Sequence, residues 1–547
     1  MKEPELVTAT QAELDEILDK AKPALSEQQY RLLEGVLGTF VFVMLKLQNT
    51  KASLKKFQRM LFGARTETKA NLFEGKQDPG GAGNVVQTAD DAARAAADPD
   101  GAPPSQKTKA KGHGRNGADA YGNSPIVEID YPDLNSGDPC PQCATGRVYD
   151  SPPSAIVKVV GQAPLAATVY KLQRLRCRLC EAIFSAPLPA AVASVPKYDP
   201  SCASMLAVLR YGSGMPFYRL EGLQASLHVP LPDSTQWDLV SKAVPGPRAA
   251  FDELVRQAAQ APLLHNDDTP ARILSLMAER AKIEAIGKTP DAKAINTSGI
   301  VALLPHTHKV VLFFTGHAHA GKNLAQVLAH RARGLAPPMQ MCDALASNLC
   351  GEFVTVLCNC LAHGRRKIVE VMEHFPESCR YVIELLAKVY ANDAHCRKDS
   401  LSPEQRLAHH QAHSAAPMHE LQTWMNEQFD QRLVEPNSDL GQALRYLLKH
   451  WNELTLFLRK AGAPLDNNVC ERALKRAIRH RRNSLFYKTS KGAEVGDTYM
   501  SLIHTCQLCD VNAFEYLQAL QKHAQDVIAD AALWLPWNYR EQLASVP

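Results

Sequence analysis

The sequence of 547 residues predicts a multidomain α+β protein. Three observations support this prediction: a heptad pattern near the N-terminus, two Cys-x-x-Cys pairs, and a series of apolar strands that end on carboxylates. At about 150 residues per domain, the length allows three to four folded units. Hydrophobic residues make up 45% of the chain and charged residues 22%, which is the ordinary balance of a globular protein.

Charge and hydropathy narrow the classes of function. The formal net charge of +4 neither suggests nor excludes a polyanionic partner, so a nucleic-acid partner must be argued from where the basic residues lie. The first 20 residues carry several acids and no apolar core, unlike a secretory signal. The most apolar early run, Val36 to Leu45, is far shorter than the roughly 20 residues that span a bilayer, so we expect no membrane protein. Fourteen cysteines are too sparse for a disulfide scaffold and indicate a reducing compartment.

Residues 1–70 are predicted to be a helical oligomerisation segment of the leucine-zipper type. Ser26 and Gln29 have the spacing of a capping box, which marks the start of a long helix. Apolar residues then recur at alternating spacings of four and three, with two polar positions among them. A long helix packed on its own domain is the alternative, but we favour a coiled coil and therefore a homo-oligomer. The seam consists of Leu33, Leu37, Phe40, Met44, Leu47, Lys51, Leu54, Gln58 and Leu61.

The next two segments are predicted to be a linker and a zinc ribbon. Residues 71–125 contain almost no large apolar side chain, so they cannot bury enough surface to order themselves. Residues 126–195 contain two Cys-x-x-Cys pairs separated by 33 residues, with apolar segments at 157–160 and 167–170 that look like short strands. Four thiolates at this spacing can close a tetrahedral zinc site. The predicted zinc ligands are Cys140, Cys143, Cys177 and Cys180.

Residues 196–250 are predicted to be a helix-turn-helix DNA-binding domain. Three helical segments follow one another, with breaks at residues 212–214 and 229–232, and Asp233 or Ser234 caps the last one. In such motifs the first residues of the last helix meet base edges. The candidates are Ser234, Thr235 and Gln236, although helix pairs with short turns are also common in proteins that do not bind DNA.

Residues 251–500 are predicted to hold the catalytic chemistry. An apolar strand from Leu263 ends on Asp267 and Asp268, and another ends on Asp343. Between them lie strand candidates at 272–277, 299–304 and 309–314 and a helical stretch at 322–332. This order is that of an RNase H-like (retroviral-integrase-type) α/β domain, in which the first and fourth strands are neighbours. Asp267 and Asp343 would then form an oxygen site suited to Mg²⁺.

A third carboxylate, Glu471, lies near the start of a strongly basic helix that Asp466 or Asn467 caps. That pattern suits a helix that lies along a phosphate backbone with its acid turned toward a metal. The alternative is an ordinary basic surface helix in which Glu471 pairs with Lys475. Residues 364–462, by their pattern, are a helical insertion, and residues 501–547 a helical tail. We expect Cys506 and Cys509 to pack in the core, and the histidines at 409, 410 and 413 to lie on a solvated helix face.

Several short motifs, in one order, resemble those of the insertion-sequence-66 family, which are bacterial DDE transposases. The resemblance covers nearly the whole chain apart from the linker. The motifs are Leu61-Phe-Gly-Ala-Arg65, the paired Cys-x-x-Cys, Met215-Pro-Phe-Tyr-Arg219, Asp267-Asp-Thr-Pro270, Met341-Cys-Asp-Ala-Leu345, Cys360-Leu-Ala-His-Gly-Arg-Arg366, Asp466-Asn-Asn-Val-Cys-Glu-Arg472, Arg482-Asn-Ser-Leu-Phe486 and Trp534-Leu-Pro-Trp-Asn538.

The resemblance implies an enzyme that cleaves DNA and transfers strands with two Mg²⁺ ions held by Asp267, Asp343 and Glu471. Asp267 rather than Asp268 is preferred because the family's first aspartate precedes a second acid. The implied partners are double-stranded DNA (terminal inverted repeats and target) and small accessory proteins of the same element, in a cytoplasmic, nucleoid-associated setting. Arg365 and Arg366 are candidate DNA contacts that could equally cap helices. The candidates on the basic helix are Arg472, Lys475, Arg476, Arg479 and Arg482.

Two other functions are compatible with the same motifs. A transposase-derived repressor would bind DNA without cleaving it, but all three acids are present and no motif is broken. An RNase H-like nuclease that acts on RNA or on branched DNA would carry the same triad. The zipper and the two DNA-binding modules would be unexpected in such a nuclease.

Overall fold

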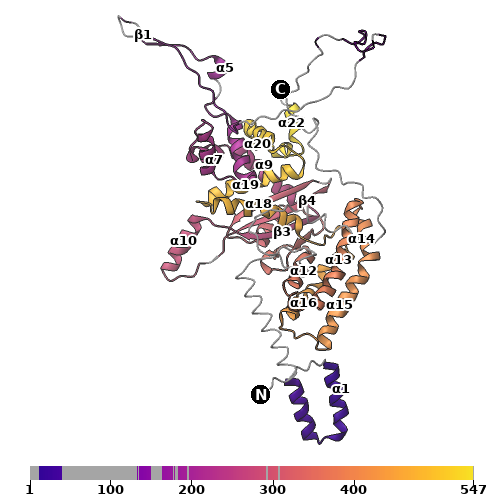
Figure 1. Ribbon diagram of the computed structural model, residues 1–547. Helices are drawn as coiled ribbons and strands as arrows, with labels where there is room; N and C mark the ends of the chain where they lie inside the picture. Colours follow the sequence, from indigo (N-terminus) through magenta and orange to yellow (C-terminus); the bar gives the residue numbers. More distant parts are fainter. Residues whose placement is uncertain are drawn as a thin grey trace, which may run out of the picture. The chain divides into compact units, whose positions relative to one another are not determined.

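The computed structural model describes residues 11–39, 196–290, 294–305 and 308–545, together with parts of the segment 132–193 (Figure 1). The linker predicted at 71–125 lies outside the described residues. Among the described helices, none is both long and apolar enough to cross a bilayer.

The N-terminal helices begin where the capping signals predict. The Ser26 N–H donates to Gln29 Oε1 at 3.0 Å and the Gln29 N–H donates back to Ser26 Oγ at 3.4 Å, so the predicted capping box is formed. Leu33 and Leu37 lie in the helix that follows, whereas the seam from Phe40 onward lies outside the described residues. Self-association through this helix therefore stays a prediction. The elements are α1 (Gln11–Ala21), the 3₁₀ turn η1 (Lys22–Ala24) and a helix whose described part is 27–39.

The first Cys-x-x-Cys pair lies in a tight turn. Pro139 and Arg147 form a β-bridge, and the Cys140 N–H donates to Gly146 O at 2.8 Å. The Gly146 N–H donates to Cys143 Sγ at 3.4 Å, and with the Thr145 N–H it lowers the pKa of the Cys143 thiol to about 7. A thiol with a lowered pKa is suited to bind a metal.

The zinc ribbon itself stays a prediction, because Cys177 and Cys180 lie outside the described residues. The strands of this segment, β1 (Arg174–Arg176) and β2 (Ile183–Ser185), pair antiparallel and flank the second Cys-x-x-Cys pair. The strand predicted at residues 167–170 is wrong, since these residues form no ladder. The strand predicted at 157–160 lies outside the described residues.

Three helices follow in the order predicted for the helix-turn-helix segment. They are α6 (Pro200–Ala207), which continues into the π-helical turn η3 (Val208–Gly212), α7 (Phe217–Ser226) and α8 (Asp233–Lys242). Leu220 of α7 and Val240 of α8 are fully buried in the same core. The predicted cap of α8 is wrong: the helix begins after Pro232, and no side chain caps it. A short helix α5 (Ala190–Ala193) precedes this group.

A five-stranded mixed sheet forms the centre of the next part of the chain. The strand order is β5-β4-β3-β6-β7, in which β3, β4 and β5 pair antiparallel and β6 and β7 continue parallel to β3. The predicted adjacency of the first and fourth strands is therefore confirmed. The strands are β3 (Leu263–Pro270), β4 (Asn296–Leu303), β5 (Lys309–Gly316), β6 (Met339–Cys342) and β7 (Val356–Asn359).

The strand predicted at residues 272–277 is wrong, because this stretch begins a helix, α10 (Leu274–Ala285). No residue of α10 is buried, and the helix projects from the sheet (Figure 1). A short apolar run fits a strand or a helix equally well, and here the helix forms. Strand β7 was not predicted.

Helices cover both faces of the sheet. α18 (Asn468–Ser484) crosses β3 and β4, while α9 (Pro245–Ala259) and α11 (Ala320–Leu328) contact β4 and each other. Side chains alternate along β4, so that Gly299 lies against Leu474 of α18 while Ser298 accepts a hydrogen bond from Asn323 of α11. α18 and α11 therefore cover opposite faces of the sheet.

Helix α19 (Ser490–Leu508) closes the free edge of the sheet at β5. Three outward backbone N–H groups of β5 donate to side chains that recur every four residues along α19: Val311 to Thr505 (3.1 Å), Phe313 to Ser501 (2.9 Å) and Thr315 to Asp497 (2.6 Å). An edge strand otherwise presents unpaired N–H groups to any passing strand. Cys506 is fully buried on the same helix, which confirms its predicted place in the core.

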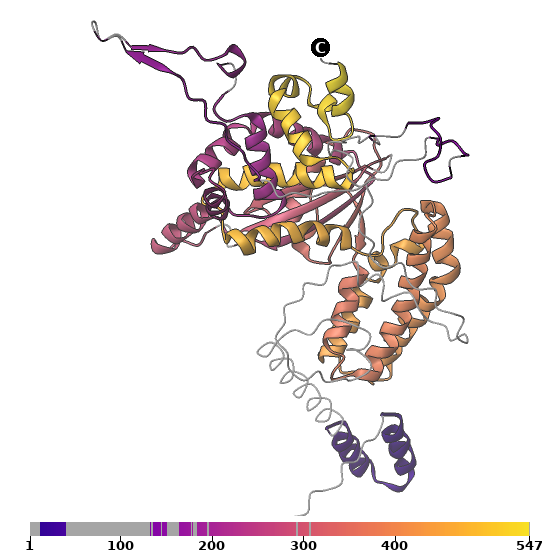
Figure 2. The same ribbon diagram turned by 45° about the horizontal axis from the view of Figure 1, so that its top comes forward.

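The predicted insertion is helical and forms its own apolar core (Figure 2, orange). Residues 403–430 form two helices that meet at Ser414. Pro417 has no N–H for the His413 carbonyl, which accepts instead from Asn392 Nδ2 at 3.1 Å. The helices are α12 (Leu361–Glu370), α13 (Pro376–Lys398), α14 (Pro403–His413), α15 (Ala415–Asp430), α16 (Asp439–Lys449), α17 (Trp451–Leu454) and the 3₁₀ turn η6 (Leu456–Leu458).

The solvated histidine face predicted on α14 is wrong for His410. This side chain is buried, and its Nε2 lies 3.3 Å from the buried carboxylate of Asp393. His413 on the same helix is exposed as expected. The tail predicted after residue 501 is helical, and Tyr516 donates from its hydroxyl to Trp534 O at 2.8 Å. It comprises the end of α19, then α20 (Ala513–Lys522), α21 (Ala524–Ala529), η7 (Ala531–Trp534) and α22 (Tyr539–Ser545).

Candidate active site

Asp267 and Asp343 lie side by side at the ends of β3 and β6. The parallel register pairs His265 with Met341, so each aspartate lies two residues beyond the same rung. One amide group touches both: Asn348 Nδ2 lies 2.5 Å from Asp343 Oδ1 and 3.5 Å from Asp267 Oδ1. Because both carboxylates contact the same amide nitrogen, they lie next to each other.

Asn348 is a site residue that the sequence analysis missed. It ends a 3₁₀ turn, η5 (Ala346–Asn348), and is buried. Its backbone carbonyl accepts from Asn266 Nδ2 at 2.8 Å and from Gln340 Nε2 at 2.7 Å, which are buried amides on β3 and β6. The signal in the sequence was the pair Asn266 and Gln340 within apolar strands, because a buried side-chain amide needs a hydrogen-bond partner nearby. These bonds fix the turn that carries Asn348.

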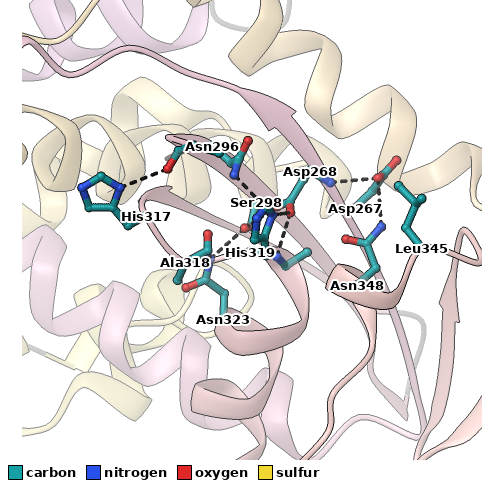
Figure 3. A network of polar contacts seen from close by, with 12 residues as sticks. Asp267, Asp268, Asn296, Ser298, His317, Ala318, His319, Asn323, Leu345 and Asn348 are labelled. Carbon is teal, nitrogen blue, oxygen red and sulfur yellow. Dashed lines mark hydrogen bonds and ion pairs between the residues drawn. The ribbon is translucent and has the colours of Figure 1, made fainter. Parts of the chain in front are cut away.

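Asp268 faces away from the other two acids. Its carboxylate accepts from Ser298 Oγ (2.6 Å) and the Ala320 N–H (2.9 Å), and His319 Nδ1 lies 3.0 Å from it (Figure 3). Cross-strand partners point to the same face of a sheet. Asp268 is paired with Ser298, on the side of α11, and Asp267 is paired with Gly299, on the side of α18. The geometry therefore favours Asp267 as the acid that joins Asp343.

Helix α18 docks on the sheet next to Asp267. Asn467, at the start of the helix, lies 3.0 Å from His265 Nδ1 through its Oδ1 and donates from Nδ2 to Asn266 O at 3.1 Å. One turn later, Cys470 Sγ donates to Gly299 O at 3.2 Å. Because Gly299 is the cross-strand partner of Asp267, these contacts seat the first turn of α18, which carries Glu471, on the strands next to Asp267.

Two side chains of α12 lie next to the Glu471 carboxylate. His363 Nδ1 lies 3.7 Å from Glu471 Oε1, and Arg366 Nη2 lies 3.6 Å from Glu471 Oε2. Oε1 is buried and has no hydrogen-bond partner among the described residues. The alternative in which Glu471 pairs with Lys475 is not what forms, since the acid turns toward α12 and the sheet.

The pKa of Asp267 is raised to about 7, mainly by burial and in addition by the negative charges of Asp343, Glu471 and Asp268, while a hydrogen bond from the Asp268 N–H acts in the opposite direction. Carboxylates crowded in this way repel one another unless a proton or a cation lies between them. The arrangement is therefore suited to hold a divalent cation.

A second set of donors overlaps this site. One ligand atom each of Cys360, His363 and Glu471 lies within 4.8 Å of the others. Burial raises the pKa of the Cys360 thiol to about 12, and its Sγ already accepts from the Asn467 N–H at 3.2 Å. A protonated thiol is a poor metal ligand. Burial therefore weighs against Cys360 as a ligand in this second set.

The basic side chains of α18 divide into two groups. Four exposed cations recur at spacings of three and four and therefore share one face of the helix: Arg472, Lys475, Arg479 and Arg482. We call this set the cationic stripe. Arg476 is half-buried, and burial lowers the pKa of its guanidinium. Arg365 is also half-buried, and Arg366 is exposed but paired with Glu471.

Of the predicted base-contacting residues on α8, one is wrong. The Gln236 side chain is fully buried and donates to Leu231 O at 2.8 Å and Phe217 O at 3.3 Å, so it holds α7 and α8 together and cannot reach a base. Ser234 is exposed and Thr235 half-buried. The spacing on α8 gave no sign of this, because the acceptors come from α7 and the turn.

Comparison with known proteins identifies the family. The sequence model described as "Transposase IS66 family" matches residues 197–495, which is more than half of the chain. The chain belongs to the IS66 transposase family. The chain is also similar to two uncharacterized proteins of Sinorhizobium fredii (strain NBRC 101917 / NGR234). It is 24% identical to y4jD over 67% of this chain and 71% of that protein, and 22% identical to y4hP over 68% of each.

The matched region contains the sheet, the helical insertion and all three acids of this IS66 family member. It begins at α6 and ends within α19, so it also contains the three helices of the helix-turn-helix segment. The N-terminal helices and both Cys-x-x-Cys pairs lie outside it.

Proposed function

We propose that this chain is the transposase of a bacterial insertion sequence, which binds terminal inverted repeats and catalyses Mg²⁺-dependent cleavage and transfer of DNA strands. The observation that carries the proposal is that Asp267 and Asp343 contact one amide group of Asn348, while the charge of Glu471 on the neighbouring helix raises the pKa of Asp267. The strand order β5-β4-β3-β6-β7 supports an RNase H-like fold for residues 251–500. Membership of the IS66 family supports the choice of DNA as substrate.

The donor set fits a hard divalent cation. Carboxylate oxygens are the ligands that Mg²⁺ prefers, and Glu471 Oε1 is buried without a partner. Asp267, Asp343 and Glu471 would hold two Mg²⁺ ions, which supply an activated attacking oxygen and charge stabilisation at the leaving oxygen. Because cations compete with protons at such a site, binding keeps Asp267 ionised at neutral pH despite its raised pKa.

The other residues of the site position the acids and the DNA. Asn348 orients the carboxylates of Asp267 and Asp343 with one amide group. His363 and Arg366 fix the rotamer of Glu471 from the side of α12. The cationic stripe begins directly after Glu471 and is suited to bind the phosphates of a strand whose scissile phosphate lies at the carboxylates.

The remaining modules would bind and assemble the ends of the element. We assign repeat recognition to the helix-turn-helix segment, with the exposed Ser234 and the half-buried Thr235 as the candidates on α8. A zinc ribbon built on Cys140 and Cys143 with the second Cys-x-x-Cys pair would add DNA contacts. The N-terminal coiled coil would pair two protomers, and small proteins of the same element would assist in the nucleoid.

The test uses the purified full-length protein and a labelled duplex that carries the DNA flanking its coding sequence. We expect Mg²⁺-dependent nicking and joined strand-transfer products, both lost in Asp343→Asn while DNA binding persists. Asp268→Asn is the matched control and should retain nicking. Binding without nicking by the wild-type protein would instead identify a repressor, and nicking without joined products would identify a nuclease.

A further inference from the structure

The chain makes an unusual turn where α18 ends. Leu485 follows the last helical residue, Ser484, with φ 66° and ψ −44°. The Phe486 N–H donates to Ser484 O at 2.8 Å, so that Leu485 is the central residue of a three-residue turn. Positive φ with negative ψ is the classic γ-turn, which is rare and strained for a residue with a side chain. No Gly relieves the strain at this position.

The same turn exposes apolar surface. The Leu485 side chain is 58% exposed and that of Phe486 is 37% exposed. Strained backbone persists where surrounding structure enforces it, and such sites concentrate at functional positions. Here a strained backbone exposes a leucine to water, and both the strain and the exposed apolar surface lower the stability of the free protein.

Rigid structure holds the turn from beneath. The Tyr487 N–H donates to Arg272 O at 2.9 Å, and Tyr487 O accepts from the Leu274 N–H at 2.9 Å. The Tyr487 ring is stacked on the His480 ring of α18 at 5.0 Å. On the other side, Arg210 donates to Ser484 Oγ. The tip is therefore clamped between α10, α18 and the helix-turn-helix segment.

The turn directly follows the helix that carries the cationic stripe. Leu485 lies three residues after Arg482, the last cation of the stripe. Lys488, also exposed, lies on the far side of the tip. At 1.5 Å per helical residue, the tip lies about 21 Å along α18 from Glu471. A polyanion that follows the stripe away from the carboxylates therefore meets Leu485 next.

We propose that Leu485 is a wedge that enters the base stack of duplex DNA, with the Phe486 ring against the step that it opens. The proposal rests on the proposed function, which puts the scissile phosphate at the carboxylates. With base pairs 3.4 Å apart along a strand, the wedge would enter about six base pairs from that phosphate. Apolar side chains flanked by cations open and kink base steps in this way.

The choice of DNA over a protein partner follows from the flanking charges. Arg482 precedes the tip and Lys488 follows it in the chain, and both are exposed cations. Both side chains can bind phosphate groups, whereas lysine is depleted at the core of protein–protein interfaces. The energy lost in unstacking one step is offset by phosphate contacts along the stripe, and the preformed turn avoids an ordering cost at the moment of binding.

The test uses the full-length protein with a 40-base-pair duplex, nicked at its centre, in Ca²⁺ instead of Mg²⁺. 2-Aminopurine, which fluoresces when unstacked, replaces one base at a time from the nick outward. We expect the fluorescence to rise about threefold at one or two adjacent positions about six base pairs from the nick. Leu485→Ala should abolish the rise and change the Kd for the duplex less than about threefold, because the phosphate contacts remain.

Matched variants separate the wedge from general damage. Leu485→Met keeps an apolar tip and should retain the signal, and Leu533→Ala, at an exposed leucine of η7, should leave it unchanged. Leu485→Gly should also abolish the signal and raise the Tm, because glycine relieves the strained turn. A wild-type protein that binds and nicks DNA but gives no rise at any position overturns the wedge alone. Absence of both binding and nicking overturns the proposed function, and the wedge with it. A change of oligomeric state in Leu485→Ala with an unchanged fluorescence pattern would assign the tip to a protein interface and refute the wedge.

Discussion

Gly299 is the position where the fold and the candidate active site depend on the same contact. A Cβ at this residue would lie 2.9 Å from Leu474 Cδ2 and 3.0 Å from Leu474 Cγ. Leu474 is buried against the sheet, so the added methyl group crowds a packed side chain. In Gly299→Ala we expect α18 to shift outward, and Glu471 with it. We expect the variant to lose both stability and nicking activity.

The size of both losses follows from the clash. Overpacking of this kind typically costs about 1–3 kcal/mol, which corresponds to a fall in Tm of about 2–10 °C for a domain of this size. A shift of Glu471 by about 1 Å would lower the nicking rate about 100-fold. Thermal denaturation and a nicking assay below the Tm measure the two effects separately.

A double-mutant cycle makes this prediction specific. Leu474→Ala alone should cost about 2–5 kcal/mol through the cavity that it leaves. In Gly299→Ala/Leu474→Ala the added methyl group fills part of that cavity, so the double variant should be more stable than the sum of the single effects by about 1–2 kcal/mol and should regain nicking. Gly222→Ala, where an added Cβ meets nothing within 4 Å, is the control and should not destabilise the protein. Strict additivity, or an unchanged Tm in Gly299→Ala, would show that α18 is not seated on Gly299.

Three further predictions follow from the hydrogen bonds of the sheet. Asp268→Ala should lower the free energy of unfolding by about 2–4 kcal/mol, because the Ala320 N–H and Ser298 lose a charged acceptor. The folded variant should still nick DNA. Loss of nicking with unchanged stability would show that Asp268 acts in catalysis and not in stability. Ser501→Ala should cost about 1–3 kcal/mol in urea denaturation, because the Phe313 N–H is left buried without an acceptor; a cost below about 0.5 kcal/mol would contradict the edge contact. Burial raises the pKa of Asp497 to about 7, so its contribution to stability is full below its ordinary pKa of 3.8 and is lost as pH rises to 7. The free energy of unfolding should fall by about 4 kcal/mol over this range in the wild-type protein, and this fall should be absent in Asp497→Asn. The same pH profile in both proteins would refute the prediction.

The pairing of Asp267 with Asp343 could be predicted because it needs only strand order. Once the first and fourth strands are parallel neighbours, residues at their carboxyl ends must meet. The choice between Asp267 and Asp268 needed the register with β4, which decides the face that each side chain takes. Alternation along β3 shows only that the side chains of Asp267 and Asp268 point to opposite faces of the sheet, and does not show which of them faces α18.

Contacts between distant segments could not be predicted from local pattern. His410 looks solvated on its own helix, and only the packing of α13 brings Asp393 to it. Gln236 looks available for DNA until α7 places a carbonyl at its amide. Residues 272–277 are a short apolar run, which predicts a strand as readily as a helix. The helix that forms there has no buried residue, so its sequence carries no helical pattern of apolar positions that would distinguish the two.

The closing of the β5 edge by α19 has a consequence for synthesis of the protein on the ribosome. The three acceptors for β5 are made between 182 and 194 residues after their donors. At translation rates of about 5–20 residues per second, a nascent chain carries an open sheet edge for about 10–40 s. Glu471 emerges in the same late interval, so an incomplete chain holds only part of the acidic set. A ribosome that stalls within the helical insertion would therefore release a product that tends to aggregate but cannot cut DNA.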